Sequence, residues 1–85
     1  MKVTLRYFAR LREQLGCDAE QAELPDTVAS VAALLHWLRS RGQPWSEALA
    51  SERAFRVAVN QDLAQADTAL ATGDEIALFP PVTGG

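Results

Sequence analysis

The sequence contains one cysteine, one histidine and no long apolar run, and each of these shortages excludes a class of protein. Cys17 has no second cysteine with which to form a disulfide, which is typical of a reducing compartment, so we expect a cytoplasmic protein. No apolar run approaches the length of a membrane span and no leader is evident, so we expect no membrane partner. His36 and Cys17 are too few to form a zinc site, and we expect no metal.

Positive charge and catalytic motifs are also scarce. The chain carries 8 Lys plus Arg against 11 Asp plus Glu, a formal net charge of -3, and no segment concentrates basic residues. A phosphate-binding face needs such a concentration, so nucleic acid is not an expected partner. The sequence also lacks a nucleophile elbow and a glycine-rich phosphate loop. We therefore expect no cofactor bound by this chain.

The first half of the chain alternates short strands with helices. Residues 2–8 place apolar side chains at every second position, which predicts a strand, and Phe8 falls on its opposite face. Residues 9–16 change to a helical period and end in a glycine, which predicts a short helix. Residues 18–24 form a weak, polar pattern typical of an edge strand. The strongest helix signal follows Asp26 and Thr27, which we interpret as the capping residues, and its apolar stripe contains Val28, Val31, Leu34, Leu35 and Leu38.

The second half of the chain predicts further short strands. Residues 45–53 have too short a period to assign more than one further helical turn. Residues 55–59 alternate again, and Asn60 with Gln61 turns the chain toward residues 62–63. The turn at residues 72–74 leads into a last strand at residues 75–79, with Ile76 and Leu78 on its buried face. Pro80 follows, and proline cannot continue a strand ladder.

This order of elements predicts an α+β fold in which a mixed sheet packs on one main helix. The β-grasp, or ubiquitin-like, arrangement fits best, as one domain over residues 1–79 with an extended, flexible tail over residues 80–85. In that arrangement the first and last strands are central neighbours. We therefore expect Phe8 and Phe79 to lie close together on the outer face of the sheet.

The tail is the segment with the clearest chemical potential. Gly84 and Gly85 lack side chains, so they can pass through a narrow channel and adopt backbone angles closed to other residues. Six extended residues from Pro80 onward span about 20 Å at roughly 3.3 Å each, enough to carry a terminal atom into a partner protein. A frayed terminus with no function would look similar. The spacing alone leaves both interpretations open.

A resemblance favours the functional tail over the frayed terminus. The run Phe79-Pro80-Pro81-Val82-Thr83-Gly84-Gly85 resembles the C-terminal end of molybdopterin synthase small subunits. Features upstream resemble the same family in the same order: residues 7–9 and 11–13, Thr27-Val28, residues 59–61, and Leu70 with residues 72–75. The resemblance covers the chain apart from residues 39–53.

The resemblance implies a sulfur carrier whose reactive atom lies on Gly85, with Gly84 beside it. A ubiquitin-activating-like adenylyltransferase would use ATP to adenylate the Gly85 carboxylate, and a sulfurtransferase system would convert it to a thiocarboxylate. Its sulfur would attack cyclic pyranopterin monophosphate inside the large synthase subunit, in a heterotetramer. The chain is then a co-substrate and not an enzyme by itself.

The same resemblance implies a docking surface for these partners. Phe8, Leu63 and Phe79 are expected to form an apolar patch on the solvent face of the sheet. Four tail residues, Pro80, Pro81, Val82 and Thr83, are expected to contact the partner as the tail enters it. Alternatively, residues 45–53 cover this face and make the aromatic side chains part of the core.

Other functions remain open at this point. A sulfur carrier of thiamine biosynthesis has a similar fold and the same Gly-Gly chemistry, but usually lacks the Phe-Pro-Pro-Val-Thr run. A ubiquitin-like protein modifier would be joined to lysine through Gly85. A β-grasp binding module with an inactive tail is the third alternative.

Overall fold

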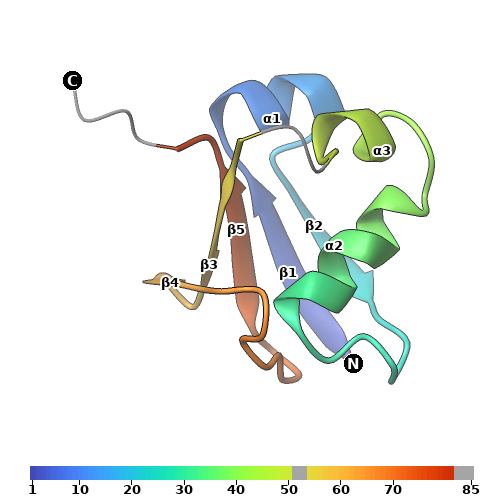
Figure 1. Cartoon of the computed structure of the whole chain (residues 1–85), viewed down its shortest axis with the longest axis vertical. Helices are drawn as coiled ribbons and strands as arrows, with labels where there is room; N and C mark the ends of the chain where they lie inside the picture. Colours follow the sequence, from blue (N-terminus) through green and yellow to red (C-terminus); the bar gives the residue numbers. More distant parts are fainter. Residues whose placement is uncertain (51–53, 82–85) are drawn as a thin grey trace.

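The computed structural model describes residues 1–50 and 54–81, which form a five-stranded sheet with helices on one face and across one end (Figure 1). The strand order is β2-β1-β5-β3-β4. No helix among the described residues is long and apolar enough to cross a membrane. The elements in chain order are β1 (Lys2–Tyr7), α1 (Ala9–Leu15), β2 (Ala19–Glu23), α2 (Val31–Arg39), α3 (Trp45–Ala48), β3 (Arg56–Val59), β4 (Asp62–Leu63) and β5 (Glu75–Phe79).

The first and last strands form the centre of the sheet, as predicted. β1 and β5 run parallel, with Tyr7 opposite Leu78, and the Phe8 N–H extends the ladder by donating to the Leu78 carbonyl at 3.1 Å. The inward side chains of both strands are fully buried against α2, because alternate positions of each strand are apolar. This topology is the β-grasp fold.

The short elements around this pair also match their predictions. α1 ends at Gly16, whose φ of 76° is left-handed, and the Gly16 N–H donates to the Arg12 carbonyl at 3.0 Å. Glycine closes a helix in this way without the steric cost that a Cβ would add. β2 lies at the sheet edge, where its polar sequence suits an exposed strand.

The predicted start of the main helix is wrong. α2 is capped by Ser30, whose hydroxyl accepts a hydrogen bond from the Ala33 N–H at 3.2 Å. The residues before it stay non-helical because Ser30 pairs with Ala69 in a β-bridge, which holds its backbone extended. Val28 is buried as expected, but it belongs to a turn and not to the helical stripe. Tertiary pairing thus overrides a local capping signal.

Two turns at the lower end of the sheet are bonded to each other. Asn60 and Gln61 have φ values of 51° and 74°, the geometry of a two-residue hairpin between β3 and β4. The Asn60 amide donates to Asp74 at 2.9 Å and accepts from the Glu75 N–H at 3.0 Å. Asp74 in turn accepts from the Ala71 N–H at 2.8 Å. These contacts fix where β5 begins.

The new assignment of the helix cap gives a direct test of stability. We expect Ser30→Ala to lower the free energy of unfolding by about 1 kcal/mol, because it leaves a helix N–H without its acceptor. Thr27→Ala is the matched control, since it removes a hydroxyl from the capping residue suggested by the sequence. Urea unfolding of both variants checks this, and an equal or larger loss for Thr27→Ala would contradict the assignment.

Candidate docking face and tail

The face of the sheet opposite α2 carries the residues predicted to meet a partner. The described helices lie on the other side of the sheet and across its upper end (Figure 1). The described part of residues 45–53 contains α3, which packs against α1 and α2. This described part does not cover the outer face, so it does not bury the aromatic side chains there.

A row of residues crosses the middle of this outer face. The strand register places Leu63 of β4 beside Ala58, Ala58 beside Ala77, and Ala77 beside Arg6. The two alanines in the middle have short side chains and form a low floor. Leu63 and Arg6 stand at its two borders, and Leu63 is 73% exposed. The middle of the face is therefore formed by small apolar side chains, with longer side chains on either side.

Phe8 and Phe79 lie at the tail end of this floor. Phe8 follows the last β1 residue and is 38% exposed, whereas Phe79 ends β5 and is half-buried. They occupy neighbouring positions of adjacent strands, because Tyr7 is opposite Leu78 one residue earlier. Leu63 lies two strands away from β5, beyond β3. The three predicted residues thus border the alanine floor without forming a contiguous cluster.

Strained backbone holds Phe8 in its place. Ala9 has a φ of 52°, an uncommon value for a residue other than glycine, and it turns the chain from β1 into α1. The Arg6 guanidinium lies over the Phe8 ring, 5.3 Å from its centroid, which is within the range of a cation–π contact. Strain of this kind persists where the surrounding structure over-determines it, and it often accompanies functional positions.

The tail begins where these residues meet. β5 ends at Phe79, and Pro80 and Pro81 are half-buried and outside any strand. The other predicted tail residues, Val82, Thr83, Gly84 and Gly85, lie outside the described part of the chain.

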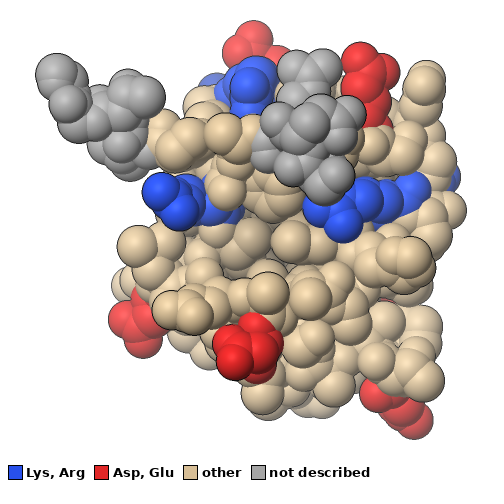
Figure 2. Space-filling view, viewed as in Figure 1, with Lys and Arg blue, Asp and Glu red and all other residues tan. Residues whose placement is uncertain are grey.

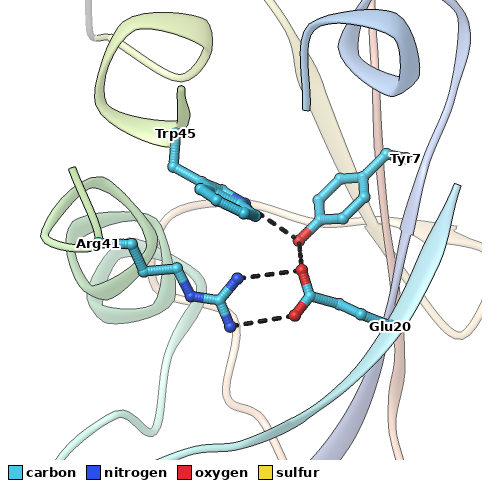
Figure 3. A network of polar contacts seen from close by, with 4 residues as sticks. All are labelled: Tyr7, Glu20, Arg41 and Trp45. Atoms are coloured by element: carbon cyan, nitrogen blue, oxygen red, sulfur yellow. Dashed lines mark hydrogen bonds and ion pairs between the residues drawn. The ribbon is translucent and has the colours of Figure 1, made fainter. Parts of the chain in front are cut away.

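A polar cluster on the helix side of the sheet was not expected from the sequence (Figure 3). The Tyr7 hydroxyl donates to Glu20 at 2.8 Å, and Arg41 makes two hydrogen bonds to the same carboxylate at 3.0 and 3.1 Å. The Trp45 indole N–H points to the Tyr7 hydroxyl at 3.5 Å. The Arg41 guanidinium also lies over the rings of Trp37 and Trp45, at 4.7 and 4.9 Å.

This cluster joins elements and does not form a reactive centre. It connects β1 and β2 to the segment between α2 and α3, a region in which the sequence shows no family motif. The signal that could have revealed it is Tyr7, because a buried phenol almost always has a hydrogen-bond partner. Burial raises the pKa of the Tyr7 hydroxyl, so the phenol remains a donor.

The remaining titratable candidates do not form a site either. Burial, together with the charges of Glu20 and Asp18, raises the pKa of the Cys17 thiol, which disfavours the reactive thiolate. His36 is exposed on α2, as expected. Within residues 1–50 and 54–81, no three His, Cys, Asp or Glu side chains are grouped so that they could hold a metal ion.

Comparison with known proteins is consistent across nearly the whole chain. The model of the ThiS family matches residues 5–85. The molybdopterin synthase sulfur carrier subunit of Haemophilus influenzae is 44% identical over 93% of this chain and 94% of its own length. The subunit of the same name from Escherichia coli is 39% identical over 98% of this chain and 99% of its own.

Solved structures agree in fold. A putative molybdopterin converting factor subunit 1 from Pyrococcus furiosus has a TM-score of 0.79 and 32% identity, covering 96% of this chain and 99% of that one. SAMP1 from Haloferax volcanii has a TM-score of 0.76 and 31% identity over both full lengths. The complex of subunits 1 and 2 of molybdopterin-converting factor from Helicobacter pylori contains a chain with a TM-score of 0.66 and 26% identity, again over both full lengths.

The polar cluster predicts a dependence of stability on pH. Partial burial acts to raise the pKa of Glu20, but the hydrogen bonds from Arg41 and Tyr7 and the charge of Arg41 outweigh it, and the pKa is lowered. A lowered pKa stabilises the fold above the unfolded value of about 4.3, and this stabilisation disappears as the pH falls through the folded value.

We expect Glu20→Gln to cost about 1–2 kcal/mol at neutral pH, between the values typical of exposed and buried ion pairs. The difference between parent and variant should shrink in acid. Urea unfolding at several pH values measures it, and Glu13→Gln, on the exposed side of α1, controls for the loss of one negative charge. A difference that stays constant down to strong acid would contradict the role given to this carboxylate.

Proposed function

Since the chain belongs to the ThiS family, we propose that it is the sulfur-carrying small subunit of a molybdopterin synthase, with its reactive atom on the carboxylate of Gly85. Two relatives that bear this name match it over almost their full lengths. The observation that carries the proposal is the position at which the tail begins. It leaves the central strand at Phe79, directly beside a face that no described helix covers and that Phe8 and Leu63 border.

The proposed cycle makes an unreactive carboxylate into a sulfur donor. A Gly85 carboxylate oxygen attacks the α-phosphorus of ATP on an adenylyltransferase, pyrophosphate leaves, and the acyl adenylate acquires a good leaving group. A sulfurtransferase system then delivers sulfur at the oxidation level of sulfide, which attacks the acyl carbon, displaces AMP and leaves a thiocarboxylate. The tail keeps this soft nucleophile attached to one protein while it moves between enzymes, which raises its effective concentration at each site.

In the second half of the cycle the sulfur reaches its acceptor on the large subunit. The thiocarboxylate sulfur attacks a carbon of cyclic pyranopterin monophosphate and displaces an oxygen substituent, which leaves that carbon with the bonding electron pair and is protonated or remains on the phosphate. Water then cleaves the resulting thioester, which leaves sulfur on the pterin and a free Gly85 carboxylate. A dithiolene needs two sulfurs, so each product consumes two thiocarboxylates, and we propose that the small and large subunits assemble as a heterotetramer. We place the cycle in the cytoplasm, where ATP and reduced sulfur are available.

The positions of the polar groups in this chain indicate which subunit supplies the catalytic groups. The Tyr7–Glu20–Arg41 cluster connects structural elements on the helix side, away from the face where the tail begins. We therefore propose that the acid, base and phosphate-binding groups belong to the large subunit. The small subunit supplies the sulfur, the tether and the docking face.

A second function is favoured by one comparison. SAMP1 from Haloferax volcanii matches this chain over its full length. A second structure from the same organism is named small archaeal modifier protein 1. A modifier would use the same tail, but Gly85 would be joined to a lysine amine of a target. The two functions differ in the final acceptor and not in the fold.

The proposed function is tested by intact mass. After incubation with ATP, a sulfur source and the cognate activating enzyme, we expect a mass increase equal to replacement of one oxygen by sulfur. The variant that lacks Gly85 should show no increase, yet melt at an almost unchanged temperature. Gly85 recovered in an isopeptide bond, with no thiocarboxylate, would favour the modifier instead.

The docking face is tested by a charge placed on its border. We expect Leu63→Asp to weaken binding to the cognate large subunit by roughly 2 kcal/mol, about thirtyfold in Kd, because a carboxylate would be desolvated in the interface. Folding should change little, since Leu63 is 73% exposed. Phe79→Asp should weaken binding too.

Calorimetry of binding, run beside thermal unfolding, separates these effects. Ala32→Asp is the control, since it adds the same charge at an exposed position of α2 on the other side of the sheet. Unchanged affinity of Leu63→Asp, or an equal loss for Ala32→Asp, would remove the outer face as the docking surface.

A further inference from the structure

The outer face carries positive charge in a chain whose net charge is -3. Arg6 borders the alanine floor, in register with Ala77. Arg56 lies one row nearer the tail, opposite Phe79. Both belong to outward positions of their strands, because the residues that follow them, Tyr7 and Val57, are buried. Two cations therefore lie on the proposed docking face, at the border of the alanine floor.

A third arginine reaches the same corner from another element. Arg10 belongs to α1, two residues after Phe8, and its guanidinium donates to the Ala54 carbonyl at 3.1 Å. Ala54 lies two residues before Arg56. Arginines from β1, α1 and β3 thus gather near the end of β5, where the tail begins. We call Arg6, Arg10 and Arg56 the tail-base arginines.

Negative charge is distributed differently. In the view of Figure 2, the charged side chains of the lower part are all Asp or Glu. Every Lys and Arg that is visible lies in the upper half, together with some acidic side chains. The tail also begins in the upper half (Figure 1). On the face shown, the basic side chains therefore lie in the half of the molecule from which the tail leaves.

Apart from the contact of Arg6 with the Phe8 ring, the tail-base arginines form only weak polar contacts among the described residues. Arg6 lies 3.8 Å from Glu75, and both side chains are largely exposed, so this pair adds little stability. Arg10 bonds an uncharged carbonyl. Arg56 forms no ion pair with any residue that the structure describes. Arg41, by contrast, holds Glu20 with two bonds and is stacked between two indole rings.

We propose that the surface of the large subunit that receives this face is acidic opposite the tail-base arginines. The inference rests on the proposed function, because it takes the large subunit as the partner. Carboxylates there would accept the exposed guanidiniums at the rim of the interface, while the alanine floor and Leu63 supply its apolar part.

The consequence of such an arrangement lies mainly in the rate of association. Complementary charges at the rim of an interface steer and orient the encounter, whereas they change the dissociation rate less. A chain of net charge -3 would otherwise be repelled by an acidic surface. The tail-base arginines let this chain approach tail first, which is the orientation that sulfur delivery requires.

The test compares charge reversal at two ends of the same face. We expect Arg56→Glu to lower the association rate constant for the cognate large subunit about three- to tenfold at low salt, with most of the effect gone near 1 M salt, where the screening length is roughly 3 Å. Lys2→Glu makes the same change in net charge at the far end of β1 and should have much less effect. Stopped-flow binding at several salt concentrations measures both.

Three results are informative. A salt-dependent slowing confined to Arg56→Glu, with an unchanged melting temperature, supports an acidic receiving surface. Equal rates for parent and Arg56→Glu, or equal slowing by Lys2→Glu, overturn the inference and leave the proposed function standing. If the parent chain fails to bind the large subunit at all, the proposed function fails, and the inference fails with it.

Discussion

Parallel pairing of the first and last strands is the constraint on which the rest of this structure depends. The register that sets Tyr7 opposite Leu78 buries one side of both strands under α2. The same register brings Phe8 beside Phe79 and leaves the chain pointing away from the sheet at Pro80. A shift of one residue would turn the buried side chains of β5 to the solvent and move the start of the tail away from the proposed docking face.

The two faces of the sheet differ in how completely their polar and apolar groups are satisfied within the chain. On the helix side, polar groups are satisfied within the chain, as the carboxylate of Glu20 is by Tyr7 and Arg41. On the outer side, Leu63 stays exposed and Arg56 has no ion-pair partner among the described residues. Groups that are complete within the chain stabilise the fold, whereas incomplete ones remain available to another protein.

Much of this architecture could be predicted from the sequence, because local patterns specify most of it. Alternation identified β1 and β5, Gly16 marked the end of α1, and the two prolines marked the end of the sheet. The cap of α2 could not be found in this way, since the β-bridge between Ser30 and Ala69 joins residues far apart in sequence. The ion pair of Arg41 could not be predicted for the same reason, because its partner Glu20 lies on another element.

For the candidate site, the sequence predicted which face of its own strand a residue occupies, but not its neighbours on other strands. The outward parity of Phe8 and Phe79 was visible in the sequence, but Leu63 was not expected to lie two strands away across an alanine floor. Arg6 and Arg56 look like ordinary surface residues until the register places them beside Ala77 and Phe79. Only cross-strand pairing shows that scattered residues share one surface.

The central position of β5 also has a mechanical consequence. A partner that holds the tail applies force to the C-terminal end of β5, whose hydrogen bonds to β1 on one side and β3 on the other lie across the strand axis. These bonds are loaded in shear and share the force together, whereas a strand peeled from an edge would lose them one at a time. The carrier can therefore be drawn firmly against its partner through the tail without losing the strand from which the tail extends.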